Sequence, residues 1–247
     1  MISNTLLKDI KSLQLKKNRQ QRQQFLVEGA KSVLELIESD FIIEHILCTD
    51  EFFEKYSHIN NTLINNKIDL ITEKQIEKLG SFKSNSLALA VAHTKPNVPL
   101  IIENNELALV LDDVRDPGNL GTIIRIADWY GINKIIASKT TTDQYNPKVI
   151  SSTMGSFTRV DMFYTHLPDF LEKYNGNIYG AFMEGENIHN TKTIEKGLVV
   201  MGNESNGISI EIERLVNKKL TIPKFGRAES LNVAVATAVI LDNFRSS

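Results

Sequence analysis

Short apolar runs of strand length alternate along the chain with segments whose apolar residues recur at helical spacing. In the first 95 residues this pattern predicts helices over 4–22, from Gly29 to Ile37, near 50–56 and over 73–80, and strands over 25–28, 43–48, 68–71 and 87–92. Helices and strands that alternate in this way indicate a small α/β domain.

The second half of the chain shows the same alternation, but its strand candidates are more continuously apolar. They lie at 107–111, 134–137, 160–164, 178–182 and 198–201, and a further strand begins at Leu220. Such strands are typical of a mostly parallel sheet covered by helices on both faces. Ligands of such sheets usually bind beyond the carboxyl ends of the strands.

A change of composition separates these two halves. Pro96 and Pro99 favour extended backbone, and the polar residues 103–106 that follow cannot build a core. We therefore expect one domain over 1–95, a linker over 96–106 and a second domain over 107–247.

The composition is that of a globular protein, with 42% hydrophobic residues and a formal net charge of −2 over 247 residues. No apolar run reaches the length of a membrane span, and the N-terminus is too polar for a secretory signal. Cys48 is the only cysteine, which excludes an internal disulfide and a thiolate zinc site, and the histidines show no metal-binding spacing. We expect a cytoplasmic protein with no membrane and no metal partner.

Positive charge is concentrated at the N-terminus, where residues 1–31 hold seven lysines and arginines against two acidic residues. A local basic face can bind nucleic-acid phosphate even when the whole protein is weakly acidic. A solvated helix face is the alternative interpretation.

The first segment with chemical potential is LDDVRDPGNLGTIIRIADWYG, residues 111–131. A strand ends there, a turn follows, and a helix begins at about Asn119. The predicted buried stripe consists of Leu120, Ile123, Ile124, Ala127 and Tyr130. Arg125 lies off this stripe, and Gly121 leaves room for its guanidinium to lie back toward Asn119. This corner suits a phosphate or a developing oxyanion, although a capped helix with a solvent-facing arginine is also compatible.

The second segment is VVMGNESNGIS, residues 199–209, in which an apolar strand ends at Gly202 in a loop of Asn, Ser and Gly. Glu204 is the only charged residue between Lys196 and Glu211. A lone carboxylate in such a loop is a candidate to position a polar substrate group. A simple turn before a helix capped by Ser209 is the alternative.

The third segment is IPKFGRAESLNVAVATAVIL, residues 222–241. Pro223 ends a strand, and Ser230 is a candidate N-cap for an apolar helix over 231–241 whose alanines suit close packing, including packing against a second subunit. Asn232 would be a costly buried polar group unless it is hydrogen-bonded; a purely structural capping role for it and Ser230 is the alternative. GxGxxG and GxxxxGK[ST] are both absent, which disfavours a standard dinucleotide or P-loop enzyme.

Together, NLGTIIR, GNE and SLNVA resemble the three motifs of the SpoU/TrmH family of RNA 2′-O-ribose methyltransferases, in the SPOUT superfamily. The segment FLVEGAKSVLELI resembles a small RNA-binding domain that is similar to ribosomal protein L30e. The resemblance implies a C-terminal parallel-sheet α/β domain with a deep trefoil knot that forms a pocket for S-adenosylmethionine. It also implies a homodimer and an N-terminal L30e-like domain that binds the RNA substrate.

The resemblance also assigns roles to particular residues. It places the catalytic residues at Arg125, Asn119, Glu204, Asn232 and Ser230. It places the cofactor-binding residues at Met201, Gly202, Asn203, Gly207, Ile222, Pro223, Ser230 and Leu231. With lower weight, KVISSTMGS resembles a further family stretch, around Lys148, Ser152 and Gly155. Lys224 departs from the family, in which an apolar residue often stands there.

Family proposals make Arg125 the general base, but an arginine stays protonated in almost every protein setting. We expect Arg125 instead to orient the ribose-phosphate and to stabilise negative charge on the 2′-oxygen, and Glu204 to fix Arg125 or the ribose. We expect ribosomal RNA as the substrate, because the N-terminal domain is commoner in ribosomal enzymes of the family. The alternatives are a transfer RNA 2′-O-methyltransferase, a non-catalytic RNA-binding protein, and a methyltransferase acting at guanine N1, which the SLNVA segment disfavours.

Overall fold

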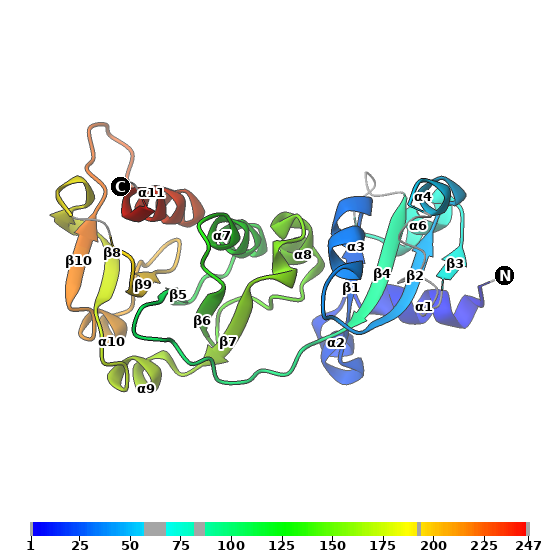
Figure 1. Cartoon of the computed structure of the whole chain (residues 1–247), viewed down its shortest axis with the longest axis horizontal. Coiled ribbons are helices and arrows are strands. Elements are labelled where there is room, and N and C mark those ends of the chain that lie inside the picture. The colour runs from blue at the N-terminus through cyan, green and yellow to red at the C-terminus, as the bar shows by residue number, and fades with distance from the viewer. Residues whose placement is uncertain (1, 57–67, 82–86, 192–193, 246–247) are drawn as a thin grey trace. The chain divides into compact units, whose positions relative to one another are not determined.

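The computed structural model describes residues 2–56, 68–81, 87–191 and 194–245, and the chain separates into two compact units (Figure 1). Unit 1 comprises residues 1–96 together with 143–158, and unit 2 comprises 97–142 together with 159–247. Residues 143–158 thus belong with the N-terminal part of the chain, although they lie within the continuous stretch 107–247 expected for the second domain. None of the helices in the described residues is long and apolar enough to cross a bilayer.

Unit 1 is built on a four-stranded sheet with strand order β1-β4-β2-β3. Its strands are β1 (Gln24–Glu28), β2 (Ile43–Cys48), β3 (Ile68–Leu70) and β4 (Ala88–His93), and its helices are α1 (Asn4–Ser12), α2 (Lys16–Arg22), α3 (Ala30–Ile37), α4 (Asp50–Lys55), α6 (Glu73–Leu79), α8 (Pro147–Thr153) and the 3₁₀ turn η2 (Ser156–Thr158). Side chains alternate between the faces of β1, so Phe25 and Val27 enter one apolar cluster and Leu26 enters another. The sheet is therefore covered on both faces.

The single helix expected over 4–22 is wrong, because the chain forms α1 and α2 with a turn between them. The break is stabilised by contacts that are distant in sequence. The Arg19 guanidinium donates to the carbonyl oxygens of Leu13, at 3.0 Å, and of Gln14, at 2.9 Å. It also donates to the Asp143 carboxylate at 2.7 Å. Carbonyls that a continuous helix would bond internally are satisfied here by a side chain.

Arg19 also differs from the rest of the basic N-terminus. Its side chain is only 3% exposed, whereas the five lysines of this stretch are exposed. Those lysines are Lys8, Lys11, Lys16, Lys17 and Lys31. The basic N-terminus thus contains one buried structural cation and a set of solvent-facing ones.

Unit 2 is built on a six-stranded sheet with strand order β10-β8-β9-β5-β6-β7, in which every neighbouring pair is parallel. Its strands are β5 (Leu107–Leu111), β6 (Lys134–Ser138), β7 (Asp161–Thr165), β8 (Ile178–Asn187), β9 (Gly197–Met201) and β10 (Lys218–Thr221). Its helices are α7 (Pro117–Trp129), α9 (Leu167–Glu172), α10 (Ile210–Glu213), α11 (Val233–Arg245) and the 3₁₀ turn η3 (Ile188–Asn190). The parallel α/β sheet confirms the predicted fold class, and the knot stays a prediction.

Helices cover both faces of this sheet: α7 and α11 lie on one side, and α9 and α10 lie on the other (Figure 1). The two central strands, β5 and β9, are buried along their whole length. Their registration pairs Leu111 with Met201, so both strands end at the same level. Strand β8 is longer than expected because its second half pairs with β10, at Glu186 with Leu220 and at Asn187 with Thr221.

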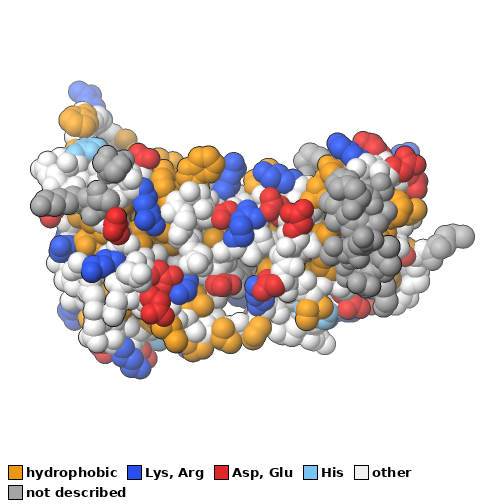
Figure 2. Space-filling view, viewed as in Figure 1, with side chains coloured by type: hydrophobic (Ala, Val, Ile, Leu, Met, Phe, Trp, Pro, Cys, Tyr) orange, Lys and Arg blue, Asp and Glu red, His pale blue; other side chains and the backbone are white. Residues whose placement is uncertain are grey.

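Acidic and basic side chains are interspersed over the face shown in Figure 2.

The Arg19–Asp143 contact should contribute strongly to stability, since removing one partner leaves a poorly exposed carboxylate and two carbonyls without their donor. We expect Arg19→Met to lower the free energy of unfolding by about 3 kcal/mol, measured by urea denaturation followed by circular dichroism. Arg22→Met is the control, because the Arg22–Asp9 pair has 40% of each side chain exposed. It should cost at most about 1 kcal/mol. Equal losses in the two variants would contradict this assignment.

Candidate active site

The loop after β5 carries two consecutive acidic residues whose side chains organise the end of the sheet. Asp112 is buried, and its Oδ2 accepts a hydrogen bond from the Ser209 N–H at 2.7 Å. Asp113 has a positive φ of 61°, an uncommon conformation for a residue other than glycine, and its N–H donates to Ser138 Oγ at 2.9 Å. The sequence reasoning missed both residues, although a pair of acids directly after a buried strand was a usable signal.

Asp113 also forms an ion pair with Arg115, with 2.9 Å between Arg115 Nε and Asp113 Oδ1. Partial burial alone would raise the pKa of Asp113, but hydrogen bonds from Arg115 and Thr140 and the guanidinium charge together lower it below its usual value. The same contact raises the pKa of Arg115. The loop therefore keeps both charges near neutral pH.

Helix α7 begins at Pro117, two residues before the expected start at Asn119. Asp116 is its N-cap, and the Asp116 side chain accepts a hydrogen bond from the Asn119 N–H at 2.9 Å. Proline suits the first helical position because its missing N–H would have no partner there. Asn119 is thus held by its backbone in the first turn, which leaves its side-chain amide available for other contacts.

A chain of hydrogen bonds, called here the amide relay, joins the three segments singled out in the sequence. The Asn119 Nδ2 donates to Glu204 Oε1 at 2.9 Å, and the Asn232 Nδ2 donates to Asn119 Oδ1 at 2.9 Å. Glu204 also accepts from the backbone N–H groups of Asp116, at 3.2 Å, and Arg115, at 3.4 Å. Residues 119, 204 and 232 therefore meet in one place, beyond the ends of β5 and β9.

Asn232, rather than Ser230, caps helix α11. Its Oδ1 accepts from the Ala234 N–H at 2.9 Å and from the Val235 N–H at 3.3 Å, and α11 begins at Val233 instead of residue 231. The Ser230 side chain is exposed and has no hydrogen-bond partner among the described residues. The expected cap at Ser230 is wrong because an asparagine two residues later satisfies the free N–H groups. Asn232 is exposed, so the expected cost of burying its amide does not arise.

The loop after β9 depends on Gly202. A Cβ at this position would lie 2.2 Å from the carbonyl carbon of Gly207 and 2.3 Å from the Ile208 nitrogen, so no larger residue fits. Two backbone hydrogen bonds close the loop: the Asn203 N–H donates to the Gly207 carbonyl oxygen, and the Gly207 N–H donates to the Asn203 carbonyl oxygen. The Asn203 side chain donates to the Asp113 carbonyl oxygen at 2.8 Å. The Asn203 amide is thus already committed to holding the two strand-end loops together.

Arg125 projects from the exposed face of α7, off the buried stripe as expected. Among the described residues its guanidinium makes no hydrogen bond and no ion pair. The sequence predicts that Glu204 fixes either Arg125 or the ribose. Glu204 contacts Asn119 and backbone N–H groups but not Arg125, so only its contact with the ribose stays a prediction. The five donors of Arg125 remain available to a ligand.

The remaining cofactor candidates fall into two groups. Met201 and Gly202 lie at the buried end of β9, whereas Ile222, Pro223 and Leu231 lie on the segment that joins β10 to α11. In the described residues, the backbone N–H groups of 224–231 have no hydrogen-bond acceptor. A segment with open backbone donors and acceptors can bind a ligand through main-chain hydrogen bonds.

The lower-weight candidates Lys148, Ser152 and Gly155 lie in unit 1, whereas the amide relay lies in unit 2. Gly155 has a φ of +102°, and a Cβ there would lie 2.5 Å from Glu35 Cγ. The Ser152 hydroxyl donates to the Lys148 carbonyl oxygen within α8. Gly155 and Ser152 thus have structural explanations, namely the packing of residue 155 against α3 and a helix-internal hydrogen bond.

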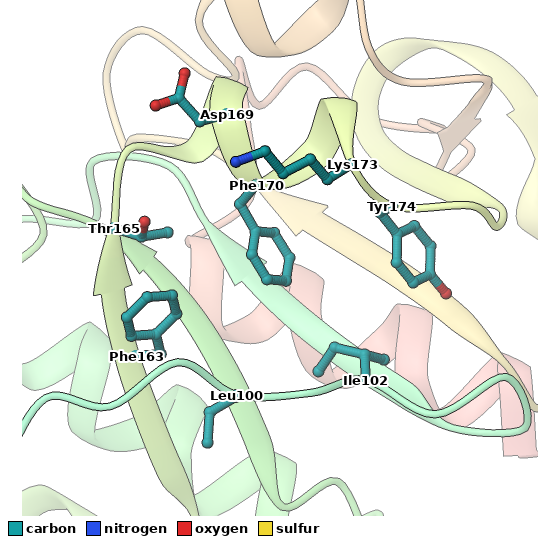
Figure 3. Close-up of a pocket in the computed structure, with 8 residues that line it drawn as sticks. All are labelled: Leu100, Ile102, Phe163, Thr165, Asp169, Phe170, Lys173 and Tyr174. Carbon is teal, nitrogen blue, oxygen red and sulfur yellow. The ribbon is translucent and has the colours of Figure 1, made fainter.

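A surface hollow of about 420 Å³ in unit 2 shares no residue with the amide relay (Figure 3). Its rings and alkyl groups come from β7, from α9 and the two residues after it, and from the extended segment before β5. The lining residues are Leu100, Ile102, Phe163, Thr165, Asp169, Phe170, Lys173 and Tyr174. Among the described residues, no group of three or more His, Cys, Asp or Glu side chains is placed to hold a metal ion.

Two family models together match most of the chain. A model of the SpoU rRNA Methylase family matches residues 106–242, and a model of the MRM3-like substrate binding domain matches residues 4–88. The chain is 30% identical to the 23S rRNA (guanosine(2553)-2'-O)-methyltransferase RlmP of Bacillus subtilis, over 98% of this chain and 96% of that protein.

Two solved structures are similar over nearly the whole chain. A putative RNA methyltransferase of the TrmH family from Porphyromonas gingivalis has a TM-score of 0.86 at 30% identity, covering 99% of this chain and 98% of that one. An AdoMet-bound rRNA methyltransferase from Sinorhizobium meliloti has a TM-score of 0.88 at 27% identity, covering 99% and 95%. These matches confirm the family, enzyme class and fold class predicted from the sequence: the chain belongs to the SpoU rRNA methylase family.

Proposed function

We propose that this chain transfers a methyl group from S-adenosylmethionine to the ribose 2′-hydroxyl of a guanosine in 23S ribosomal RNA. The observation that carries this proposal is the amide relay, which joins the three segments that resemble the family motifs. The names of the relatives support the nucleotide class. RlmP of Bacillus subtilis and RlmB of Neisseria meningitidis are both named as 23S rRNA guanosine 2'-O-methyltransferases.

Ribosomal RNA is favoured over transfer RNA by the extent of the similarities. The neighbours from Porphyromonas gingivalis and Sinorhizobium meliloti cover both units. A neighbour described as methylating C/U34 of tRNA covers only 57% of this chain, at a TM-score of 0.51. The similarity to the rRNA methyltransferase of Sinorhizobium meliloti thus extends over nearly the whole chain, whereas the similarity to the transfer RNA neighbour does not.

S-adenosylmethionine supplies an activated methyl group on a sulfonium centre. The residues at the ends of β9 and β10 fit such a group. The glycine at 202 brings two stretches of backbone close together, and the 224–231 segment offers main-chain donors that bond to none of the described residues. Met201, Gly202, Ile222 and Leu231 would hold the cofactor in this arrangement, chiefly through backbone groups.

The protein's own contribution is to position the acceptor ribose and to stabilise the charge that develops on it. The Arg125 guanidinium has no partner among the residues that the structure describes, so it can bind the ribose-phosphate and stabilise negative charge on the 2′-oxygen. The amide relay holds the first turn of α7, and therefore the start of the helix that carries Arg125. The hydroxyl proton leaves to water or to a nearby acceptor, because a protonated guanidinium cannot accept it.

The exposed lysines of α1, α2 and α3 are proposed to bind phosphates of the same RNA. They belong to the span that matches the MRM3-like substrate binding domain. Five exposed ammonium groups supply the positive field that RNA phosphates require. The alternative of a solvated helix face is disfavoured, because the family match gives this unit a substrate.

We also propose that the active form is a homodimer. Helices α7 and α11 pack against each other and leave Trp129 83% exposed and Val235 51% exposed, and a second copy of the chain could cover these side chains. Light scattering should give about twice the chain mass of 27.8 kDa, and Val235→Glu should shift this toward the single-chain mass. A single-chain mass for the unmodified protein would overturn the dimer and leave the proposed chemistry untouched.

The proposed reaction is tested by mapping 2′-O-methyl groups in total RNA from cells with and without the gene. We expect one guanosine of 23S ribosomal RNA to lose its methyl group when the gene is absent. The purified chain with S-adenosylmethionine should restore it on the unmodified RNA. Loss of methylation in transfer RNA with unchanged ribosomal RNA would assign the enzyme to the alternative substrate.

The role of Arg125 is tested by Arg125→Lys, which keeps the charge but removes the planar fork of donors. We expect kcat to fall about 100-fold, while the affinity for S-adenosylmethionine stays the same in calorimetry. Arg214→Lys is the control, because Arg214 is exposed in the same unit and lies outside the relay. Near-normal turnover of Arg125→Lys would show that a guanidinium is not required.

A further inference from the structure

The segment that joins β10 to α11 projects from unit 2 and carries the most exposed large apolar side chain in the described residues. Phe225 is 96% exposed. Figure 1 shows the segment as a loop reaching beyond the neighbouring helices, and Figure 2 shows hydrophobic and basic side chains together at its tip. A phenyl ring held this far into solvent gains nothing from the fold and is available to a partner.

Two cations flank this ring, and both are free in the described part of the chain. Lys224 and Arg227 are exposed, and neither makes a hydrogen bond or an ion pair with a described residue. One carboxylate, Glu229, stands further along the same segment. An aromatic ring between two unpaired cations matches a nucleotide, which combines a flat base with an anionic phosphate.

Both ends of the segment are anchored in unit 2, and one of them is a member of the amide relay. At one end, the Thr221 hydroxyl donates to the Met183 carbonyl oxygen at 3.0 Å. At the other end, Asn232 donates to Asn119 Oδ1 at 2.9 Å. Phe225 lies seven positions before Asn232 in the sequence, so a ligand on this loop is close along the chain to one member of the relay.

We infer that Phe225 stacks on an unpaired base of the RNA substrate, and that Lys224 and Arg227 bind the phosphates beside that base. The inference rests on the proposed function, because it takes RNA as the substrate of the same site. A base held on Phe225 would be drawn out of its neighbouring stack, which exposes the adjoining ribose to the relay and to Arg125. Stacking of this kind accepts any base, so it contributes affinity and position more than sequence selectivity.

A second copy of the chain is the competing occupant, and the charges disfavour it. Burying Phe225 in a protein interface would place Lys224 and Arg227 against that surface as well, and interface centres are depleted in lysine. The helices α7 and α11 already provide an apolar surface without flanking lysines, through Trp129 and Val235. The 224–227 tip is better matched to an anionic partner with a flat apolar face.

The test compares Phe225→Trp, Phe225→Leu and Phe225→Ala in binding an unmethylated RNA transcript that contains the target guanosine. Tryptophan keeps the aromatic face, whereas leucine keeps apolar bulk but has no ring. We expect Leu and Ala to weaken RNA binding about tenfold and Trp to bind as the unmodified protein does. Ile210→Ala is the control, since Ile210 is 67% exposed on α10 in the same unit. It should bind RNA normally.

The cations are tested with the double variant Lys224→Ala, Arg227→Ala. Its slope of log affinity against log salt concentration should be smaller by about 1 to 2 than that of the unmodified protein. Light scattering, made on each variant, should show an unchanged mass.

RNA binding by Phe225→Leu equal to that of the unmodified protein would overturn the stacking role. A fall to a single-chain mass in Phe225→Ala would likewise overturn it, because the ring would then belong to an interface between copies. Failure of the proposed function looks different: the unmodified protein would bind the transcript without transferring a methyl group to it.

Discussion

The orientation of two side-chain amides is the constraint on which the site depends. A carboxylate can only accept hydrogen bonds, so Glu204 requires Asn119 to present its nitrogen. The Asn119 oxygen must then face Asn232, whose own oxygen is left to cap α11. One acceptor-only group therefore sets the direction of every bond that follows. Replacing any member removes more than one contact, because its neighbours lose the partner that fixes their orientation.

The amide relay lies near the surface, and the buried strands β5 and β9 hold the backbone that carries it. Strands β5 and β9 are buried throughout and end in register, and the Asp112 N–H donates to the Met201 carbonyl oxygen at 2.9 Å. Close packing at Gly202 and the bond from Asn203 to the Asp113 carbonyl join the two loops further. Hydrogen bonds between exposed side chains contribute about 1 kcal/mol each, so the buried strands supply the stability and the relay supplies the geometry.

The sequence predicts those helices, strands and site contacts that a local pattern of residues determines. The strands of both sheets follow from apolar spacing, and so do four of the five residues predicted for the buried stripe of α7. The fifth, Tyr130, is wrong: it lies beyond the last turn and is only half-buried, because its hydroxyl donates to Asp242 at the surface. The three motif segments do meet as the family resemblance implied. The failures have non-local causes. Arg19 breaks the expected helix over 4–22 because it bonds Leu13, Gln14 and Asp143, and no spacing rule reveals a partner 124 residues away. The second half of β8 forms only because β10 lies beside it.

Arg19 and Arg125 show how the same residue type acquires opposite uses from its surroundings. Arg19 is buried with its donors bonded to two carbonyls and a carboxylate, so binding a phosphate would require breaking contacts that hold unit 1. Arg125 is exposed and unbonded within the described residues, so it loses only water when a ligand arrives. A guanidinium that stays hydrated until the substrate binds keeps its full electrostatic strength for the charge that develops on the ribose. That Arg125 has no partner in the described part of the chain is therefore the feature that fits it to act on the substrate. A carboxylate engineered beside it should weaken that action even if the fold is unchanged.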